Sequence, residues 1–137
     1  GDELILHEVF GAIQFKGNGM FIAGGAGVTP FIAILRKLKS ENKINGNKLV
    51  FGNKKAKDIF LEDEFNKILG KNFKNILSKE DTEQHDYHDI TKKYIEKNID
   101  DNNQFYYVCG PPAMMEMVLK NLSKIGIKEE KIIKEDF

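Results

Sequence analysis

The sequence predicts an α/β domain built on a doubly wound, five-stranded parallel sheet. Short apolar runs alternate with amphipathic segments along most of the chain, which is typical of strand–helix–strand units. The runs are continuously apolar, as in strands that are buried on both faces. With 137 residues, the chain has the length of one domain with a single core.

In the first half of the chain, the apolar run at residues 20–23 predicts the first strand. Residues 30–39 predict a helix, because apolar residues recur at helical spacing and Pro30 suits a first helical turn. A second strand is expected at residues 48–51. A short helix at residues 60–69 is expected to end at Gly70, a residue type favoured just beyond helix ends.

In the second half, residues 73–78 predict the third strand, and residues 78–90 a polar loop. A helix follows at residues 91–99, then the fourth strand at residues 105–109. The last helix is expected at residues 113–125 and the last short strand at Ile132 and Ile133. In that helix we expect these residues to face the core: Met114, Met117, Val118, Leu122 and Ile125.

Composition excludes several classes of function. Acidic and basic residues balance at 21 each, so the charge bias of nucleic-acid-binding proteins is absent. Arg36 is the only arginine, which leaves lysines and backbone amides to bind any phosphate. The single cysteine is typical of a reducing compartment, and no apolar run reaches the ~18 residues of a membrane span. We therefore expect a cytoplasmic protein without a membrane span.

A glycine-rich loop follows the first predicted strand. Ligands bind beyond the carboxyl ends of parallel strands, where glycines allow close approach and the next helix offers unpaired amides. A tight strand–helix turn without a ligand would explain the same glycines, and this motif alone does not decide between them. The candidate ligand-binding residues of this loop are Gly24, Gly25, Ala26, Gly27, Val28, Thr29 and Pro30, with the backbone amides of residues 25–28 as the candidates for binding phosphate.

A second loop of similar chemistry, Cys109-Gly110-Pro111-Pro112, follows the fourth predicted strand. In a doubly wound sheet both loops would face the same crevice. The pair therefore favours a ligand site more strongly than either loop alone.

The segments "GGAGVTPFIAILRKL", "LVFGNKKAKDIFLEDEF" and "FYYVCGPPAMMEMVLKNL", in this order and spacing, resemble the NAD(P)-binding domain of the ferredoxin–NADP reductase family of flavin oxidoreductases. The resemblance covers residues 20–137 and implies the strand order 3-2-1-4-5. It implies NADH or NADPH and FAD as cofactors, with the pyrophosphate lying against Gly25 and Gly27. It also implies that Thr29 and Cys109 frame the nicotinamide as catalytic residues, with Gly110 and Pro111 shaping the pocket.

Residues 1–19 resemble the end of a flavin-binding β-barrel, the domain that precedes the NAD(P)-binding domain in this family. The rest of that barrel is absent from the sequence. The chain is thus either a fragment of a longer reductase, which we favour, or the partner of a barrel on another polypeptide. The electron acceptor is not identified by the sequence.

The adenosine end of the coenzyme is expected near Asn53, Ser78 and Lys79. Ser78-Lys79-Glu80 looks like the Ser-Arg-Glu that reads the 2′-phosphate in NADP-using members of the family. The acidic residues after it suit NADH instead, so the coenzyme preference stays open. A terminal aromatic often covers the flavin in this family, which implies that role for Phe137; a loose terminus is an equal alternative.

Other reactive side chains have simpler interpretations. Cys109 has no adjacent base to make it a nucleophile and no soft neighbours to make it a metal ligand. His85 and His88 form an H-x-x-H pair in a polar loop without a third ligand nearby, so we expect no metal site. Methionines at positions 114, 115 and 117 are more typical of core packing than of a cofactor surface.

We therefore expect the NAD(P)H-binding half of a flavin-dependent oxidoreductase, inactive without its flavin barrel. A non-catalytic nucleotide-sensing or partner-docking module is the alternative. A flavodoxin-like protein that binds a flavin itself is a third possibility.

Overall fold

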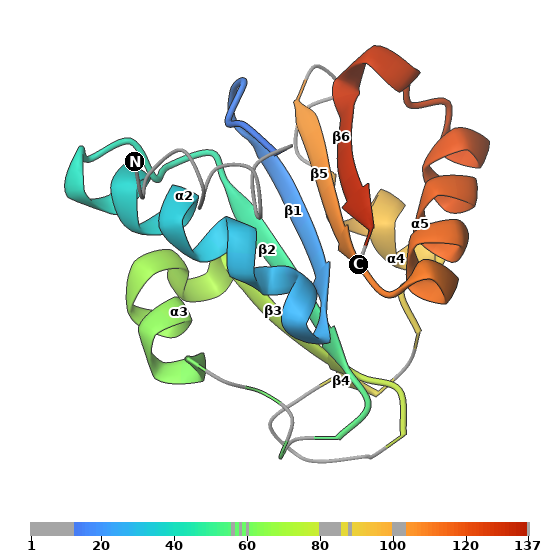
Figure 1. Ribbon diagram of the computed structural model, residues 1–137, viewed down its shortest axis with the longest axis horizontal. Helices are drawn as coiled ribbons and strands as arrows, with labels where there is room; N and C mark the ends of the chain where they lie inside the picture. Colours follow the sequence, from blue (N-terminus) through green and yellow to red (C-terminus); the bar gives the residue numbers. More distant parts are fainter. Residues whose placement is uncertain are drawn as a thin grey trace, which may run out of the picture.

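A computed structural model describes residues 13–55, 57, 59, 61–79, 86–87, 89–99 and 104–136. These residues form a six-stranded parallel sheet in the order β4-β3-β2-β1-β5-β6, with helices on both faces (Figure 1). The strands are β1 (Gly19–Gly24), β2 (Lys48–Asn53), β3 (Phe73–Leu77), β4 (Asp86–Tyr87), β5 (Phe105–Gly110) and β6 (Ile132–Asp136). The helices are α2 (Thr29–Ser40), α3 (Glu62–Leu69), α4 (Lys92–Lys97) and α5 (Pro112–Ile125), with 3₁₀ turns η1 (Gly25–Val28), η3 (Gly70–Asn72) and η4 (Glu129–Lys131).

The predicted strand order is confirmed, because β3-β2-β1-β5-β6 is the order 3-2-1-4-5 in sequence terms. The sixth strand, β4, lies in the segment predicted to be a loop. It is two residues long and pairs only at the outer edge of β3. So short a strand has no hydrophobic period that the sequence could display.

Most helix boundaries lie within two residues of the predicted ones, and the differences have local causes. Helix α3 begins at Glu62 because Leu61 adopts a left-handed conformation, with φ of 59°, which a helix cannot include. Helix α4 begins after Thr91, whose hydroxyl accepts a hydrogen bond from the Tyr94 amide. Helix α5 ends at Gly126, which has φ of 100°.

The sheet separates two hydrophobic layers. One lies under α2 and α3 and includes Phe21, Phe31 and Cys109; the other lies under α4 and α5 and includes Ile22 and Val118. Side chains that alternate along each strand therefore enter opposite layers. Because both faces are covered, the strands are continuously apolar, as the sequence predicted.

Arg36, the only arginine in the sequence, joins α2 to α3 through two hydrogen bonds to Glu64, of 2.5 and 2.7 Å. The paired charges raise the pKa of Arg36 and lower the pKa of Glu64, mainly through these hydrogen bonds. The arginine therefore serves a surface contact between helices.

The register of the central strands brings their carboxyl ends to one edge of the sheet. Ala23 of β1 lies opposite Cys109 of β5, and Gly24 lies opposite Gly52 of β2. The two glycine-containing loops, after β1 and after β5, consequently leave the sheet side by side, as the sequence predicted.

Candidate functional site

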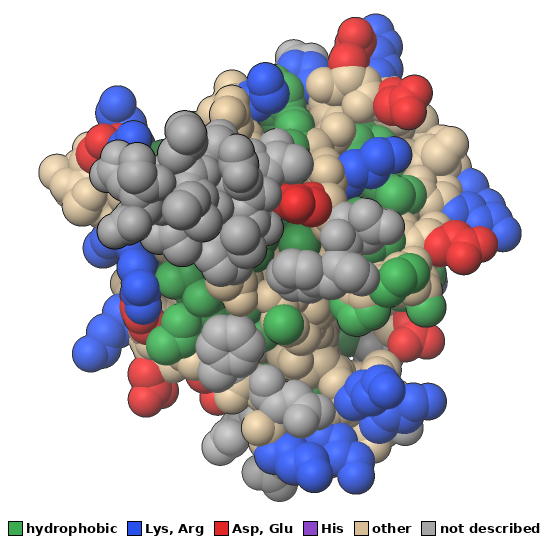
Figure 2. Space-filling model, viewed as in Figure 1, with side chains coloured by type: hydrophobic (Ala, Val, Ile, Leu, Met, Phe, Trp, Pro, Cys, Tyr) green, Lys and Arg blue, Asp and Glu red, His purple; other side chains and the backbone are tan. Residues whose placement is uncertain are grey.

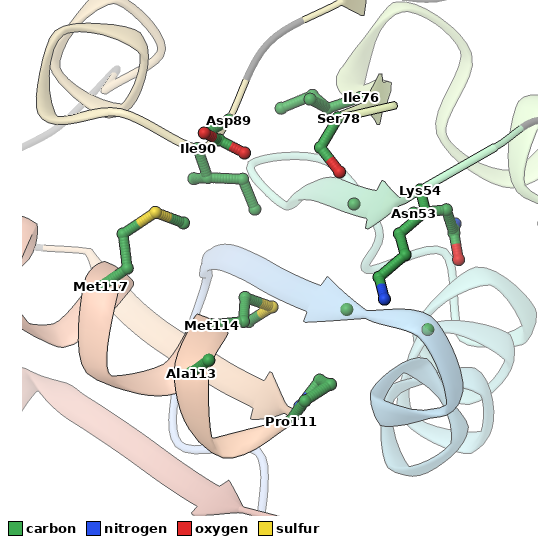
Figure 3. A pocket seen from close by; sticks show the side chains of 13 residues that line it. Asn53, Lys54, Ile76, Ser78, Asp89, Ile90, Pro111, Ala113, Met114 and Met117 are labelled. Carbon is green, nitrogen blue, oxygen red and sulfur yellow. The ribbon is translucent and has the colours of Figure 1, made fainter. Parts of the chain in front are cut away.

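A pocket of about 550 Å³ opens at the carboxyl edge of the sheet (Figure 3). Segments from four strand ends and the first turns of α5 meet around it. Its lining residues are Gly24, Gly25, Gly52, Asn53, Lys54, Ile76, Ser78, Asp89, Ile90, Pro111, Ala113, Met114 and Met117. A pocket of this volume at the switch point of a doubly wound sheet is the usual place for a small-molecule ligand.

Gly25 is the glycine of the first loop that faces open space. It adopts φ of 52°, and a Cβ atom built on it would meet no other atom within 4 Å. Only glycine takes this left-handed conformation without strain. The bare backbone of η1 therefore borders the pocket at this residue, beside the amino end of α2.

Gly27 has a different role. It is buried, and a Cβ atom on it would collide with the Cys109 carbonyl oxygen and lie 2.6 and 2.7 Å from the Cys109 carbonyl carbon and Gly110 Cα. The missing side chain thus lets the turn after β1 pack directly on the end of β5. Gly27 brings the two loops together without lining the pocket itself.

The second loop closes against the first through Met114. A Cβ atom on Gly24 would overlap the Met114 sulfur, and one on Gly110 would lie 2.8 Å from that sulfur. Pro111 follows in an extended conformation and precedes α5. Both loops therefore meet at the start of α5, as Figure 3 shows for Pro111 and Met114.

An apolar wall forms one side of the pocket, from Ile76, Ile90, Met114 and Met117 (Figure 3). The orientation predicted for α5 is confirmed at Val118 and Leu122, which are fully buried. Met115, which was not predicted to face the core, is also buried there and is 5% exposed. Met114 and Met117 are only partly buried, as is Ile125, so the methionines serve both core packing and the pocket wall.

Polar groups also line the pocket, at the ends of β2 and β3. The Ser78 amide donates to the Asn53 carbonyl at 3.0 Å, and the Lys79 amide donates to the Lys54 carbonyl at 2.9 Å. These bonds continue the β2–β3 ladder and hold Ser78 beside Asn53. Figure 3 shows the Lys54 side chain extending toward the end of β1. The pocket lining thus combines apolar side chains with polar groups of both charges, Lys54 just after β2 and Asp89 beside Ile90.

Three exposed lysines follow β2: Lys54, which lines the pocket, and Lys55 and Lys57 beyond it. Figure 2 shows lysine side chains gathered at the lower edge of the molecule, where the loop after β2 lies in Figure 1. Positive charge at the mouth of a pocket raises the local concentration of an anionic ligand.

Asn53 carries an unpaired polar group in the pocket lining. The residue is 9% exposed, and its amide nitrogen is buried without a hydrogen-bond partner. Such a group costs ~1–3 kcal/mol unless something accepts from it. The nitrogen itself has almost no accessible surface, so a ligand acceptor would reach it only after a local shift of the pocket wall.

We expect Asn53→Leu to weaken ligand binding ~10-fold while leaving the free energy of unfolding unchanged or slightly increased. The reason is that leucine removes the orphaned amide and fills a similar volume. Isothermal titration calorimetry and urea unfolding measure the two effects. Asn75→Leu, on neighbouring β3 and outside the pocket lining, is the matched control and should bind normally. Equal affinities for wild type and Asn53→Leu would contradict the role of this amide.

Of the residues predicted for the site, five line the pocket together: Gly24, Gly25, Asn53, Ser78 and Pro111. The others that the structure describes do not line it: Ala26, Gly27, Val28, Thr29, Pro30, Lys79, Cys109 and Gly110. Cys109 is fully buried in the layer under α2 and α3, with its neighbours Phe21 and Val28. Its contact with nicotinamide, and that of Thr29, stay predictions.

Several lining residues were not predicted from the sequence. Lys54 lies in a charged turn after the second predicted strand, Ile76 lies within the third predicted strand, and Ile90 ends the predicted polar loop. Only the position of Lys54, directly after a strand end, signalled a place at the crevice.

Some predictions fall on residues outside the described part of the chain, namely those on Glu80, His85, His88 and Phe137. Within the described residues, no group of three or more His, Cys, Asp or Glu side chains is placed to hold a metal ion. None of the helices in these residues has the length and apolar character needed to cross a membrane.

Known proteins share this sequence pattern. Residues 21–120 match the family described as the oxidoreductase NAD-binding domain. Over 155 aligned positions the chain is 27% identical to a subunit of the Na(+)-translocating NADH-quinone reductase of Serratia proteamaculans, and 27% identical to the same subunit of Pseudomonas aeruginosa. Each alignment covers 100% of this chain but 37% of the relative. The chain therefore spans less than half the length of these curated relatives.

Solved structures share the fold. The flavohem-like FAD/NAD-binding domain of nitric oxide dioxygenase from Vibrio cholerae superposes with a TM-score of 0.80 at 22% identity, over 91% of this chain and 53% of that one. The cytochrome b5 reductase domain of Ulva prolifera nitrate reductase gives 0.72 at 20% identity, over 86% and 47%. A ferredoxin NADP+ reductase from Neisseria gonorrhoeae gives 0.70 at 13%, over 85% and 55%. The predicted resemblance to ferredoxin–NADP reductases is confirmed. This chain belongs to the family of oxidoreductase NAD-binding domains.

Proposed function

We propose that this chain is the NAD(P)H-binding half of a flavin-dependent oxidoreductase, which positions the nicotinamide for hydride transfer to FAD. The observation that carries the proposal is the convergence of the β1 and β5 loops on one pocket that contains an orphaned amide. The coenzyme supplies the hydride chemistry, and the chain supplies binding and orientation.

The described residues fit a dinucleotide. The apolar wall of Ile76, Ile90 and Met117 suits the flat face of an adenine, and Asn53 and Ser78 would bond to polar groups of the adenosine. The pyrophosphate would lie against the bare backbone at Gly25, where α2 adds the positive end of its dipole. Lys54 would supply a counter-charge that the single arginine does not.

NAD(P)H and FAD are the cofactors expected for a member of this family. The relatives are named as subunits of an NADH-quinone reductase, and the Vibrio cholerae neighbour is named as an FAD/NAD-binding domain. Since this chain spans 37% of such a relative, we propose that the flavin is bound mainly by a domain outside this chain. The electron acceptor beyond the flavin remains unassigned.

Titration of the 137-residue chain with NADH and with NADPH tests the proposal. We expect binding with a Kd on the order of 100 μM for the preferred coenzyme, because the proposed flavin domain, which would enclose the rest of the coenzyme, is absent from this titration. We also expect no reduction of dye acceptors by the chain alone. Failure to bind either coenzyme would refute the proposal. Binding by a full-length gene product that contains no flavin would favour the nucleotide-sensing alternative.

A further inference from the structure

The hydroxyl of Tyr107, in β5, hydrogen-bonds to the segment that leads into β1, residues 13–17, which we call the entering segment. It accepts hydrogen bonds from the backbone amides of Lys16 and Gly17, at 2.9 and 3.1 Å, and donates to the Gly17 carbonyl at 2.6 Å. About 90 residues separate the partners in sequence. A phenol has one donor and two acceptor positions, so this hydroxyl is fully used by two adjacent residues.

Burial keeps this hydroxyl in the form that the contact needs. Tyr107 has no exposed surface, and desolvation raises the pKa of its phenol despite the opposing hydrogen bonds from Lys16 and Gly17. The group therefore stays protonated, and able to donate, at neutral pH.

Aromatic packing also holds this segment on the sheet. The Tyr107 ring stacks on Phe21, with ring centroids 4.4 Å apart, and on Phe15, with centroids 6.0 Å apart. Gly17 lies flush on the ring of Phe105, where any Cβ atom would come within 2.8 Å of a ring carbon. Ile13 is buried in the same layer, although Phe15 remains 37% exposed. Residues 13–17 therefore pack against the sheet as well as hydrogen-bonding to it.

One strand carries both this contact and the pocket loop. Tyr107 and Gly110 both lie in β5, about 10 Å apart at the rise of an extended strand. Residues 15–17 are consequently held in a fixed place relative to the loop that we propose frames the coenzyme.

We propose that Tyr107 is a positioning residue, which fixes residues 15–17 on β5 and thereby sets the place of a flavin domain, itself part of this proposal and joined ahead of these residues, relative to the coenzyme. This inference rests on the proposed function for its effect on the reaction. A merely structural tyrosine would alter stability alone, whereas a positioning residue alters the rate at saturating coenzyme and leaves coenzyme affinity unchanged.

The test compares Tyr107→Phe with Tyr106→Phe in the full-length gene product that contains this chain. Tyr106 is the matched control, because it is equally buried, adjacent in β5, and enters the opposite layer, where its hydroxyl accepts from Gln104 at 3.2 Å. Two quantities are measured: amide hydrogen exchange at Lys16 and Gly17, and the stopped-flow rate of flavin reduction at saturating NADH.

For Tyr107→Phe we expect exchange at both amides to rise ~10-fold or more. Flavin reduction should slow ~5-fold with the Kd for NADH within about twofold of wild type. Tyr106→Phe should change neither quantity. Unchanged exchange would overturn the contact, and faster exchange with an unchanged rate would overturn the positioning role. A wild-type protein that binds NADH without reducing its flavin would refute the proposed function instead, and the exchange data would still decide the contact.

Discussion

Replacing Gly27 with valine is expected to lower the free energy of unfolding by about 3 kcal/mol and to abolish coenzyme binding as a consequence. The Cβ atom of the new side chain alone would collide with the Cys109 carbonyl oxygen and lie 2.7 Å from Gly110 Cα. Both neighbours are backbone atoms of a central strand, which cannot rotate away as a side chain would. Relief requires the η1 turn to lift off β5, and this separates the two loops that form the pocket.

Urea unfolding followed by circular dichroism measures the loss, with NADH titration in parallel. Gly25→Ala is the matched control, since its Cβ would enter open space. Its φ of 52° still strains an alanine, so a loss of ~1–2 kcal/mol is expected, well below that of Gly27→Val. Gly27→Val with wild-type stability and weakened NADH binding would show that Gly27 contacts the ligand instead.

These two glycines show the limit of what a local motif can specify. The motif G-x-G-x-x-P marks both as unusual, and the sequence alone assigns both to the phosphate. The structure separates them: Gly25 borders the pocket by its open backbone, and Gly27 packs one loop on another. The distinction depends on which atoms of β5 lie behind the turn, a long-range fact that no local pattern contains.

The fold was more predictable because its signal is repeated. Each buried strand is an apolar run, and each helix between strands has its own apolar stripe, so one misjudged boundary does not change the architecture. The strand order came from the family resemblance, as apolar runs alone do not specify neighbours. The left-handed conformation of Leu61 and the strand β4 were not predicted. A single left-handed leucine and a two-residue edge strand produce no periodic pattern of apolar residues in the sequence.

The site was predicted in part of its polar lining and missed in its apolar side chains. Asn53 and Ser78 stand out because each interrupts the apolar pattern at a strand end. Ile76, Ile90 and Met117 do not, because an apolar side chain that lines a pocket looks the same in sequence as one that fills a core. A small rotation of α5 decides whether a methionine faces the core or the pocket.

Replacing Ala113 with tryptophan is expected to weaken coenzyme binding ~100-fold, about 2.7 kcal/mol, while changing stability by less than ~0.5 kcal/mol. Ala113 lies in the first turn of α5, lines the pocket and is exposed to solvent. An indole ring at this position can fold onto the apolar wall beside Met117 and occupy the space proposed for the adenine. It needs no rearrangement of the core, because it replaces solvent rather than packed atoms.

Ala33→Trp provides the matched control, since Ala33 is an equally exposed alanine on α2 and lies outside the pocket lining. The same substitution there should leave both NADH affinity and the melting temperature near wild type. The comparison separates blocked space from any general effect of adding a surface tryptophan. If Ala113→Trp binds NADH as tightly as Ala33→Trp does, the coenzyme does not occupy this pocket. The chain would then have to hold its nucleotide elsewhere on the sheet edge, and the roles proposed for Asn53 and Gly25 would fall with the pocket.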